Sequence, residues 1–187
     1  MSVATGFTLF DTALGVCGLA WTADEAVAGV LLPEPDAART QARMRRRHPL
    51  ADETPIAPPA IEDAIRQIRE LLRGEPRDLL AVAVDHDGVP DFHRRVYALV
   101  RTIPAGETLT YGEVAARLGE PGAAQAVGQA MGANPTPVIV PCHRVLAANG
   151  ALGGFSAPGG TATKRRMLVI EGALPEPPPT LFDALVA

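Results

Sequence analysis

Short apolar segments alternate with polar turns in the first part of the chain. Three of them, at 7–11, 17–22 and 27–32, have the length of strands. Apolar runs of this length, bounded by turn residues, predict a small antiparallel meander. Cys17 falls inside the second predicted strand, where we expect it to pack in the core.

Helical spacing follows the meander. Residues 37–47 predict a polar helix with arginines in its last turn, where cations suit the helix dipole. Apolar residues between 61 and 72 recur at spacings of four, three and four, which predicts an amphipathic helix. The apolar run 79–84 predicts a further strand, and the whole stretch up to residue 90 an N-terminal α/β domain.

From residue 91 the pattern becomes helical. Apolar positions predict a first helix from 91 to about 103, and a capping-box sequence at 110–113 opens a short second one. A third helix is predicted over 123–133 and a last one from about 163 to 171. The second and third are joined by a glycine-containing turn, as in a helix-turn-helix; an α-helical hairpin in a core is the alternative.

These patterns predict an α+β fold with a small N-terminal α/β domain at 1–90, containing antiparallel strands. A mainly helical domain with the helix-turn-helix and an active-site loop occupies 91–174, and a proline-rich tail 175–187. No apolar run approaches the roughly 18 residues of a membrane span, and no basic region precedes an apolar one at the N-terminus. Two cysteines in 187 residues make no disulfide framework. We therefore expect a cytoplasmic monomer without a membrane partner.

Charge is distributed unevenly along the chain, whose formal net charge is −4. Residues 1–91 carry 9 basic and 15 acidic side chains, whereas residues 92–172 carry 8 basic and 4 acidic ones. The second region is therefore the basic part of an acidic protein. A phosphate-contacting surface needs such an excess, although ordinary solvated charge explains it equally well.

The candidate chemistry lies at 141–145, Pro-Cys-His-Arg-Val, after an apolar run at 138–140 that predicts a buried strand. Pro141 has no backbone donor, so the strand is expected to end or turn there and present Cys142 as a nucleophile. The alternative is that Cys142 is only a small buried hydrophobe. In an extended segment Cys142 and His143 would face opposite sides, so either the chain turns or a water relays the thiol proton.

Metal-ligand patterns are missing from the sequence. The four histidines form no pair at helical zinc spacing, and neither cysteine belongs to a Cys-x-x-Cys motif. We expect neither a metal nor a cofactor.

Asn134-Pro135-x-Pro137, three apolar residues and the motif at 141–145 resemble the signature of the O6-alkylguanine-DNA alkyltransferases, also called methylated-DNA–protein-cysteine methyltransferases. The likeness runs from about Phe92 to Gly172. It implies DNA repair in which the cysteine takes an alkyl (methyl) group from O6-alkylguanine in double-stranded DNA, irreversibly and once per molecule. Two alternatives stay open: a non-catalytic protein that recognises alkylated DNA, and an unrelated cysteine hydrolase or transferase.

The resemblance also implies roles for individual residues. It makes Cys142 the nucleophile, linked through a water to His143 and then Glu171, and it makes Asn134 the tie between the recognition helix and the active-site turn. Substrate contacts would come from Tyr111 at the target phosphate and flipped base, Ser156 at the guanine oxygen, the backbone of Cys142 and Val145 at the exocyclic amine, and Gln125. The predicted DNA-binding surface comprises Ala123, Ala124, Gln125, Gly128 and Arg144.

Two departures from the family pattern carry expectations. Gln125 stands where the family uses an arginine finger to fill the gap left by the flipped base. Because glutamine is shorter and neutral, we predict weaker or altered engagement of duplex DNA. The stretch between Ser156 and Lys164 is two residues longer than in better-known members, which is expected to change the tolerance for bulky alkyl groups.

Overall fold

The N-terminal lobe is built on a four-stranded sheet in the computed structural model, which describes residues 3–176. β1 pairs with β2 and β2 with β3 in antiparallel fashion, which confirms the predicted meander, and β4 joins in parallel to β1. The order across the sheet is β3-β2-β1-β4. The strands are β1 (Ala4–Thr12), β2 (Gly15–Thr22), β3 (Val27–Leu31) and β4 (Asp52–Glu53).

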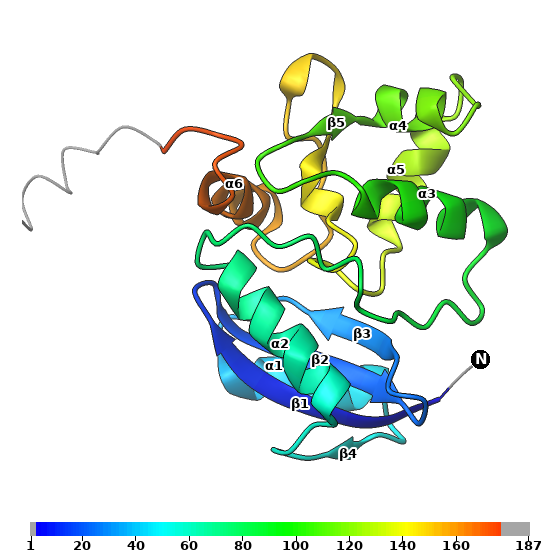
Figure 1. The fold of residues 1–187 in the computed structure, drawn as a ribbon. Coiled ribbons are helices and arrows are strands. Elements are labelled where there is room, and N and C mark those ends of the chain that lie inside the picture. The colour runs from blue at the N-terminus through cyan, green and yellow to red at the C-terminus, as the bar shows by residue number, and fades with distance from the viewer. Residues whose placement is uncertain (1–2, 177–187) are drawn as a thin grey trace, which may run out of the picture.

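Two helices, α1 (Ala37–Arg47) and α2 (Pro59–Leu71), cover opposite faces of this sheet (Figure 1). Side chains alternate between the faces of a strand, so Phe7 packs with Met44 of α1 whereas Cys17 packs in the core that α2 covers. Cys17 has no exposed surface, and burial raises its pKa to about 11. It is a core residue, as predicted.

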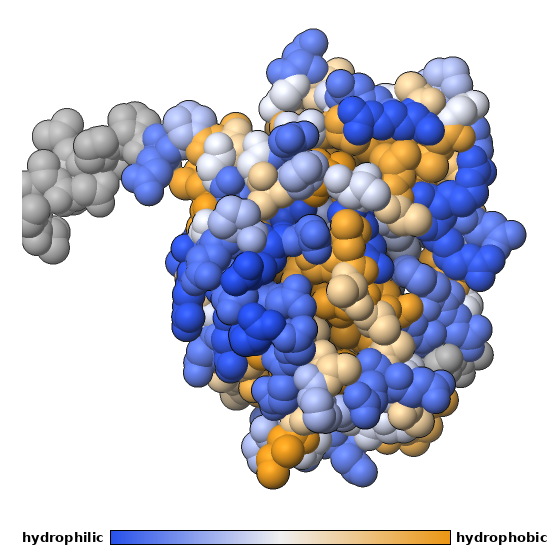
Figure 2. Space-filling model, viewed as in Figure 1, coloured by the Kyte–Doolittle hydropathy of each residue, from blue (hydrophilic) through white to orange (hydrophobic). Residues whose placement is uncertain are grey.

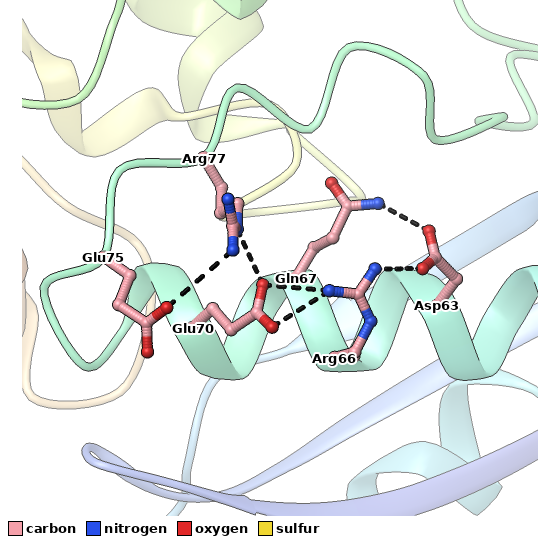
Figure 3. A network of polar contacts seen from close by, with 6 residues as sticks. All are labelled: Asp63, Arg66, Gln67, Glu70, Glu75 and Arg77. Carbon is pink, nitrogen blue, oxygen red and sulfur yellow. Dashed lines mark hydrogen bonds and ion pairs between the residues drawn. The ribbon is translucent and has the colours of Figure 1, made fainter.

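The solvent side of α2 carries a chain of ion pairs (Figure 3). Arg66 pairs with Asp63 and, at 2.9 Å, with Glu70, and Arg77 from the following segment reaches Glu70 at 2.6 Å. These contacts connect one face of the helix with the start of the linker to the second lobe.

The C-terminal lobe is mainly helical. β5 and β6 pair in parallel, and a capping box of Thr110 and Glu113 opens α4, as the sequence predicted. α6 lies between the two lobes (Figure 1), and its Met167 belongs to the core that α2 covers. The elements are α3 (Asp91–Arg101), β5 (Leu109–Thr110), α4 (Tyr111–Arg117), α5 (Ala124–Gly132), the 3₁₀ helix η1 (Cys142–Arg144), β6 (Val145–Leu146), the 3₁₀ helix η2 (Ala148–Gly150) and α6 (Gly160–Ile170).

The prediction of a strand at 79–84 is wrong. Only Val84 forms a β-bridge, to Val27, and Leu79 lies in the left-handed region with a φ of 53°. The guanidinium of Arg101 instead donates hydrogen bonds to the carbonyls of Leu79, Leu80 and Val82, at 2.8, 2.9 and 2.8 Å. Backbone groups that a distant arginine satisfies do not need a strand partner.

The outer edge of β3 is covered by segments from the rest of the chain. The N–H of Val27 donates to the carbonyl of Ala83, at 2.9 Å, and its carbonyl accepts from Asp85, also at 2.9 Å. Further along the strand, the N–H of Val30 donates to the carbonyl of Pro135, at 3.0 Å. The loop that follows α5 is therefore hydrogen-bonded to the N-terminal sheet.

Apolar side chains gather along the boundary between the lobes on the face shown in Figure 2. Most of the predicted proline-rich tail, residues 177–187, lies outside the described residues.

Candidate active site

Cys142 follows a buried turn, so the prediction of a strand at 138–140 is wrong. Val138 has a φ of 76°, and the only bridge of this segment joins Pro137 to Val140. The three apolar residues are buried because they pack into the cores of both lobes. After Pro141 the chain turns into η1, which leaves Cys142 with 7% of its surface exposed.

Asn134 fixes the turn that precedes the cysteine. Its Nδ2 donates to the carbonyl of Val140, at 2.9 Å, and its Oδ1 accepts from the N–H of Thr136, at 3.0 Å. Because Asn134 lies two residues after the end of α5, these bonds connect the end of that helix to the backbone just before Cys142.

A buried charge cluster begins directly after the cysteine in η1. His143 Nε2 is 2.9 Å from Glu171 Oε1, and Arg144 donates to both carboxylate oxygens, through Nε and Nη2, at 2.8 Å each. Arg144 Nη1 also donates to the carbonyl of Ile103, at 2.5 Å. The side chains of His143, Arg144 and Glu171 are at most 1% exposed.

The prediction that Arg144 contacts DNA is therefore wrong. Its guanidinium points inward and neutralises the Glu171 carboxylate, which would otherwise be a buried unpaired charge.

The electrostatics of this cluster set the protonation of His143. Burial raises the pKa of Glu171, but its hydrogen bonds to His143 and Arg144 and the positive charge of Arg144 outweigh it and lower that pKa to about 2. Burial lowers the pKa of His143, so the imidazole is neutral. An ionised carboxylate only accepts, so Nε2 carries the proton and Nδ1 carries the lone pair. Nδ1 is buried and has no hydrogen-bond partner among the described residues, which suits a base.

The thiol itself is protonated at rest. Burial raises the pKa of Cys142, while the Asn134 side chain and the positive charge of Lys164 act in the opposite direction. Activation of the nucleophile therefore needs a base.

Lys164 is a buried charged residue near the thiol that the sequence pattern was not used to identify. It is 1% exposed on α6, its Nζ donates to the carbonyl of Val145 at 2.7 Å, and it lies 5.9 Å from the centre of the Tyr111 ring. It shares a helix face with the buried Met167 and Leu168, at spacings of three and four residues. That spacing could have placed it inside the protein.

Two cavities meet at the cysteine. The helix-side cavity, about 570 Å³, is bounded by Tyr111 and by Ala124, Gln125 and Gly128 of α5. The sheet-side cavity, about 190 Å³, extends toward β3 and α1 of the N-terminal lobe. Both are lined by Met131, Gly132, Cys142, Phe155 and Ser156.

The first turn of α5 presents small side chains. Ala123 precedes the helix as its N-cap residue, Gln125 is exposed, and a side chain added at Gly128 would meet open space. Three basic residues of this lobe add no charge to this surface, because Arg144 and Lys164 are buried and Arg101 binds carbonyls. A nucleic acid would therefore meet backbone and small residues on this helix.

Within residues 3–176, no group of three or more His, Cys, Asp or Glu side chains is arranged to hold a metal ion. In the same range, no helix combines the length and the apolar character needed to cross a bilayer.

Comparison with known proteins bears directly on this site. Residues 91–173 match the family described as "6-O-methylguanine DNA methyltransferase, DNA binding domain". The methylated-DNA–protein-cysteine methyltransferase of Mycobacterium bovis is 44% identical over 126 residues, which cover 67% of this chain and 74% of that protein. This chain belongs to the O6-methylguanine DNA methyltransferase family.

Solved structures of the family share both lobes. The crystal structure of Mycobacterium tuberculosis OGT in complex with DNA aligns with a TM-score of 0.71 and 34% identity, over 90% of this chain and 94% of that one. The O6-methylguanine-DNA methyltransferase from Pyrococcus kodakaraensis aligns with a TM-score of 0.69 and 26% identity, over 89% and 99%. The predicted α+β fold is confirmed.

Proposed function

We propose that this chain repairs DNA by transferring the alkyl group of O6-alkylguanine to Cys142, once per molecule. The observation that carries the proposal is the position of the thiol, which lines a cavity bounded by α5 and belongs to the residue directly before a buried neutral imidazole. Membership of the O6-methylguanine DNA methyltransferase family supports the same reaction.

The reaction would begin with loss of the thiol proton. A water passes this proton from Cys142 to His143 Nδ1, and the Glu171 carboxylate stabilises the imidazolium that forms. The thiolate then attacks the alkyl carbon, a carbon–sulfur bond forms, and the carbon–O6 bond breaks with its electron pair left on the guanine. Water does not hydrolyse the thioether formed on Cys142, so each molecule reacts only once.

Double-stranded DNA would bind across α4 and α5 as across a helix-turn-helix. Ala123, Ala124 and Gly128 let the duplex approach closely, and the flipped guanine enters the helix-side cavity between Tyr111 and Ser156. In this scheme Asn134 positions the turn, and the backbone at Val145 faces the base. The protein acts as a monomer, with residues 1–90 as the N-terminal domain and 91–174 as the catalytic one.

We propose that Gln125 makes binding to duplex DNA weaker than an arginine at this position would. Its exposed side chain stands in the first turn of α5 and lines the helix-side cavity. Glutamine can form hydrogen bonds, but unlike arginine it has no charged guanidinium that can stack on the unpaired base opposite the flipped guanine. We expect Gln125→Arg to increase the repair rate on duplex DNA, whereas Gln129→Arg, exposed on the same helix but outside the cavity, should not. An unchanged or lower rate for Gln125→Arg would refute this account.

The central test is the intact mass of the protein after incubation with excess duplex oligonucleotide that carries O6-methylguanine, followed by peptide mapping. We expect one methyl group on Cys142 and no change in Cys142→Ala. Repaired DNA with unmodified protein would indicate a turnover enzyme instead. Unmodified protein that still binds the lesion would favour the recognition-only alternative.

A further inference from the structure

A buried tyrosine hydroxyl contacts the end of the helix that leads to the catalytic turn. Tyr97 of α3 is 1% exposed, and its hydroxyl donates to the carbonyl of Ala130 in the last turn of α5, at 2.9 Å. α3 and α5 lie side by side (Figure 1). Burial, with a further contribution from the negative charge of a Cys142 thiolate, raises the pKa of Tyr97 to about 12. The hydroxyl is therefore protonated at neutral pH and remains a donor.

This hydrogen bond takes the place of one that the helix lacks. If α5 continued, the carbonyl of Ala130 would accept from the N–H of Asn134, four residues further on. The helix has ended by then, and that N–H donates to the carbonyl of Met131 at 3.4 Å. The Ala130 carbonyl accepts from Ala133 at 3.2 Å, through an N–H that Gln129 shares. The last carbonyls of a helix need partners from outside it, and Tyr97 supplies one.

The segment that follows α5 has open space on one side. Ala133 and Pro135 line a cavity of about 630 Å³ between the lobes, and Tyr97 lines the same cavity. Packing alone therefore leaves this segment room to move. Two hydrogen bonds from neighbouring elements restrain it: the one from Tyr97 to the end of α5, and the one from the N–H of Val30 in β3 to the carbonyl of Pro135, at 3.0 Å.

Asn134, in the middle of this segment, transmits its position to the thiol. The Nδ2 of Asn134 and the N–H of Cys142 both donate to the carbonyl of Val140, at 2.9 and 2.8 Å. The Asn134 side chain also lowers the pKa of Cys142, against the effect of burial. A displaced Asn134 would therefore shift the backbone before the thiol and raise the thiol pKa. A misplacement of the reacting groups by about 1 Å is enough to slow a reaction roughly 100-fold.

We propose that Tyr97 is a positioning residue for alkyl transfer: it holds the end of α5 and thereby places Asn134 for its contact with the backbone before Cys142. The inference rests on the proposed alkyl transfer to Cys142 and deepens it, because it extends the site to a side chain on α3 that touches neither the thiol proton relay nor the base.

The test begins with Tyr97→Phe, which keeps the ring and removes the hydroxyl. On duplex oligonucleotide that carries O6-methylguanine, we expect the maximal single-turnover rate to fall about tenfold and the Kd for the DNA to stay unchanged. The pH profile of the reaction of Cys142 with iodoacetamide should shift to higher pH, because Asn134 then lowers the thiol pKa less.

A matched control separates positioning from a general loss of stability. Thr40 in the N-terminal lobe is equally buried, and its hydroxyl donates to the carbonyl of Val16, at 3.3 Å. Thr40→Val should lower the midpoint of urea unfolding by as much as Tyr97→Phe does, yet leave the transfer rate and the iodoacetamide profile as in the wild type.

A double-variant cycle tests the route through Asn134. If Tyr97 acts by placing Asn134, then adding Tyr97→Phe to Asn134→Ala should slow the reaction no further. Losses that multiply in the double variant would overturn the inference, and so would a wild-type rate in Tyr97→Phe or an equal loss of rate in Thr40→Val. Failure of the wild type to react with O6-methylguanine would instead refute the proposed function, and the iodoacetamide profiles would then decide the role of Tyr97.

Discussion

Two groups of charged residues in this molecule combine the same residue types in opposite surroundings. On α2, Arg66 and Glu70 form pairs at the surface, where water screens them (Figure 3). In the buried cluster that begins directly after Cys142, Arg144 and Glu171 form an ion pair whose side chains are each 1% exposed. Water cannot hydrate either charge if the other is lost. The net charge of a segment therefore says little about where its charges act. Of the eight basic residues at 92–172, Arg144 and Lys164 are buried in the interior.

The largest effect is expected when one partner of the buried pair loses its charge. Glu171→Gln leaves the Arg144 guanidinium without a counter-ion and should lower the free energy of unfolding by roughly 3–5 kcal/mol. Urea denaturation at neutral pH measures this change. Glu70→Gln on α2 is the matched control and should leave the midpoint within experimental error. A similar small change in both variants would contradict the contrast between the two groups.

Acid should weaken the fold through the same buried cluster. The pKa of Glu171 is about 2 in the folded protein against 4.5 for a free glutamate, so its contribution is complete above pH 4.5 and lost as the pH falls toward 2. That shift corresponds to roughly 3 kcal/mol. The pKa of His143 is lowered from 6.5, so its contribution is lost in the same direction, beginning below pH 6.5.

Denaturant titrations at several pH values test this expectation. Glu171→Gln should lack the loss of stability between pH 4.5 and 2 that comes from Glu171, and it should keep the loss that begins below pH 6.5 and comes from His143. If wild type and variant lost stability in parallel, Glu171 would not be the titrating group.

A smaller effect is expected at Lys164, whose charge lowers the thiol pKa. Lys164→Met keeps the apolar stem, removes the ammonium and should raise the pKa of Cys142, so that iodoacetamide reacts several-fold more slowly at neutral pH. The measurement is the pH dependence of that rate, with Arg165→Met on the exposed side of α6 as the control. A rate unaffected by the loss of Lys164 would remove this lysine from the account of thiol reactivity.

The smallest effect is expected on the surface of α2. Arg66→Ala removes its pairs with Asp63 and Glu70, and we expect no measurable change in thermal midpoint or in alkyl transfer. A clear loss of stability would mean that the network in Figure 3 acts as a unit that holds the linker.

Hydrophobic periodicity predicted the elements that bury one face. The prediction of the helix at 61–72 was correct because its apolar residues recur at helical spacing, and the meander was correct because turn residues bound its short apolar segments. The runs at 79–84 and 138–140 were mistaken for strands because loops can also be fully apolar when a distant side chain satisfies their backbone.

Arg101 and Asn134 donate the hydrogen bonds that satisfy the backbone of these two loops, and no local sequence pattern predicts these bonds. The same limit applies to the candidate site. The motif at 141–145 located the thiol, but the partner that buries Arg144 lies 27 residues further along the chain. The burial of Lys164 could have been predicted from local spacing, because it lies three and four residues before Met167 and Leu168 on the buried face of α6.

The hydrogen bonds along the outer edge of β3 hold the turn before Cys142 and also cover an edge of the sheet that could otherwise pair with another chain. Val27 and Val30 would present unpaired backbone groups if the linker and the loop at Pro135 moved away, and an open apolar edge invites pairing with another chain. The loop that holds Asn134 thus also shields the sheet from self-association. Release of this loop would cost the protein its active-site geometry and its protection against aggregation in a single event.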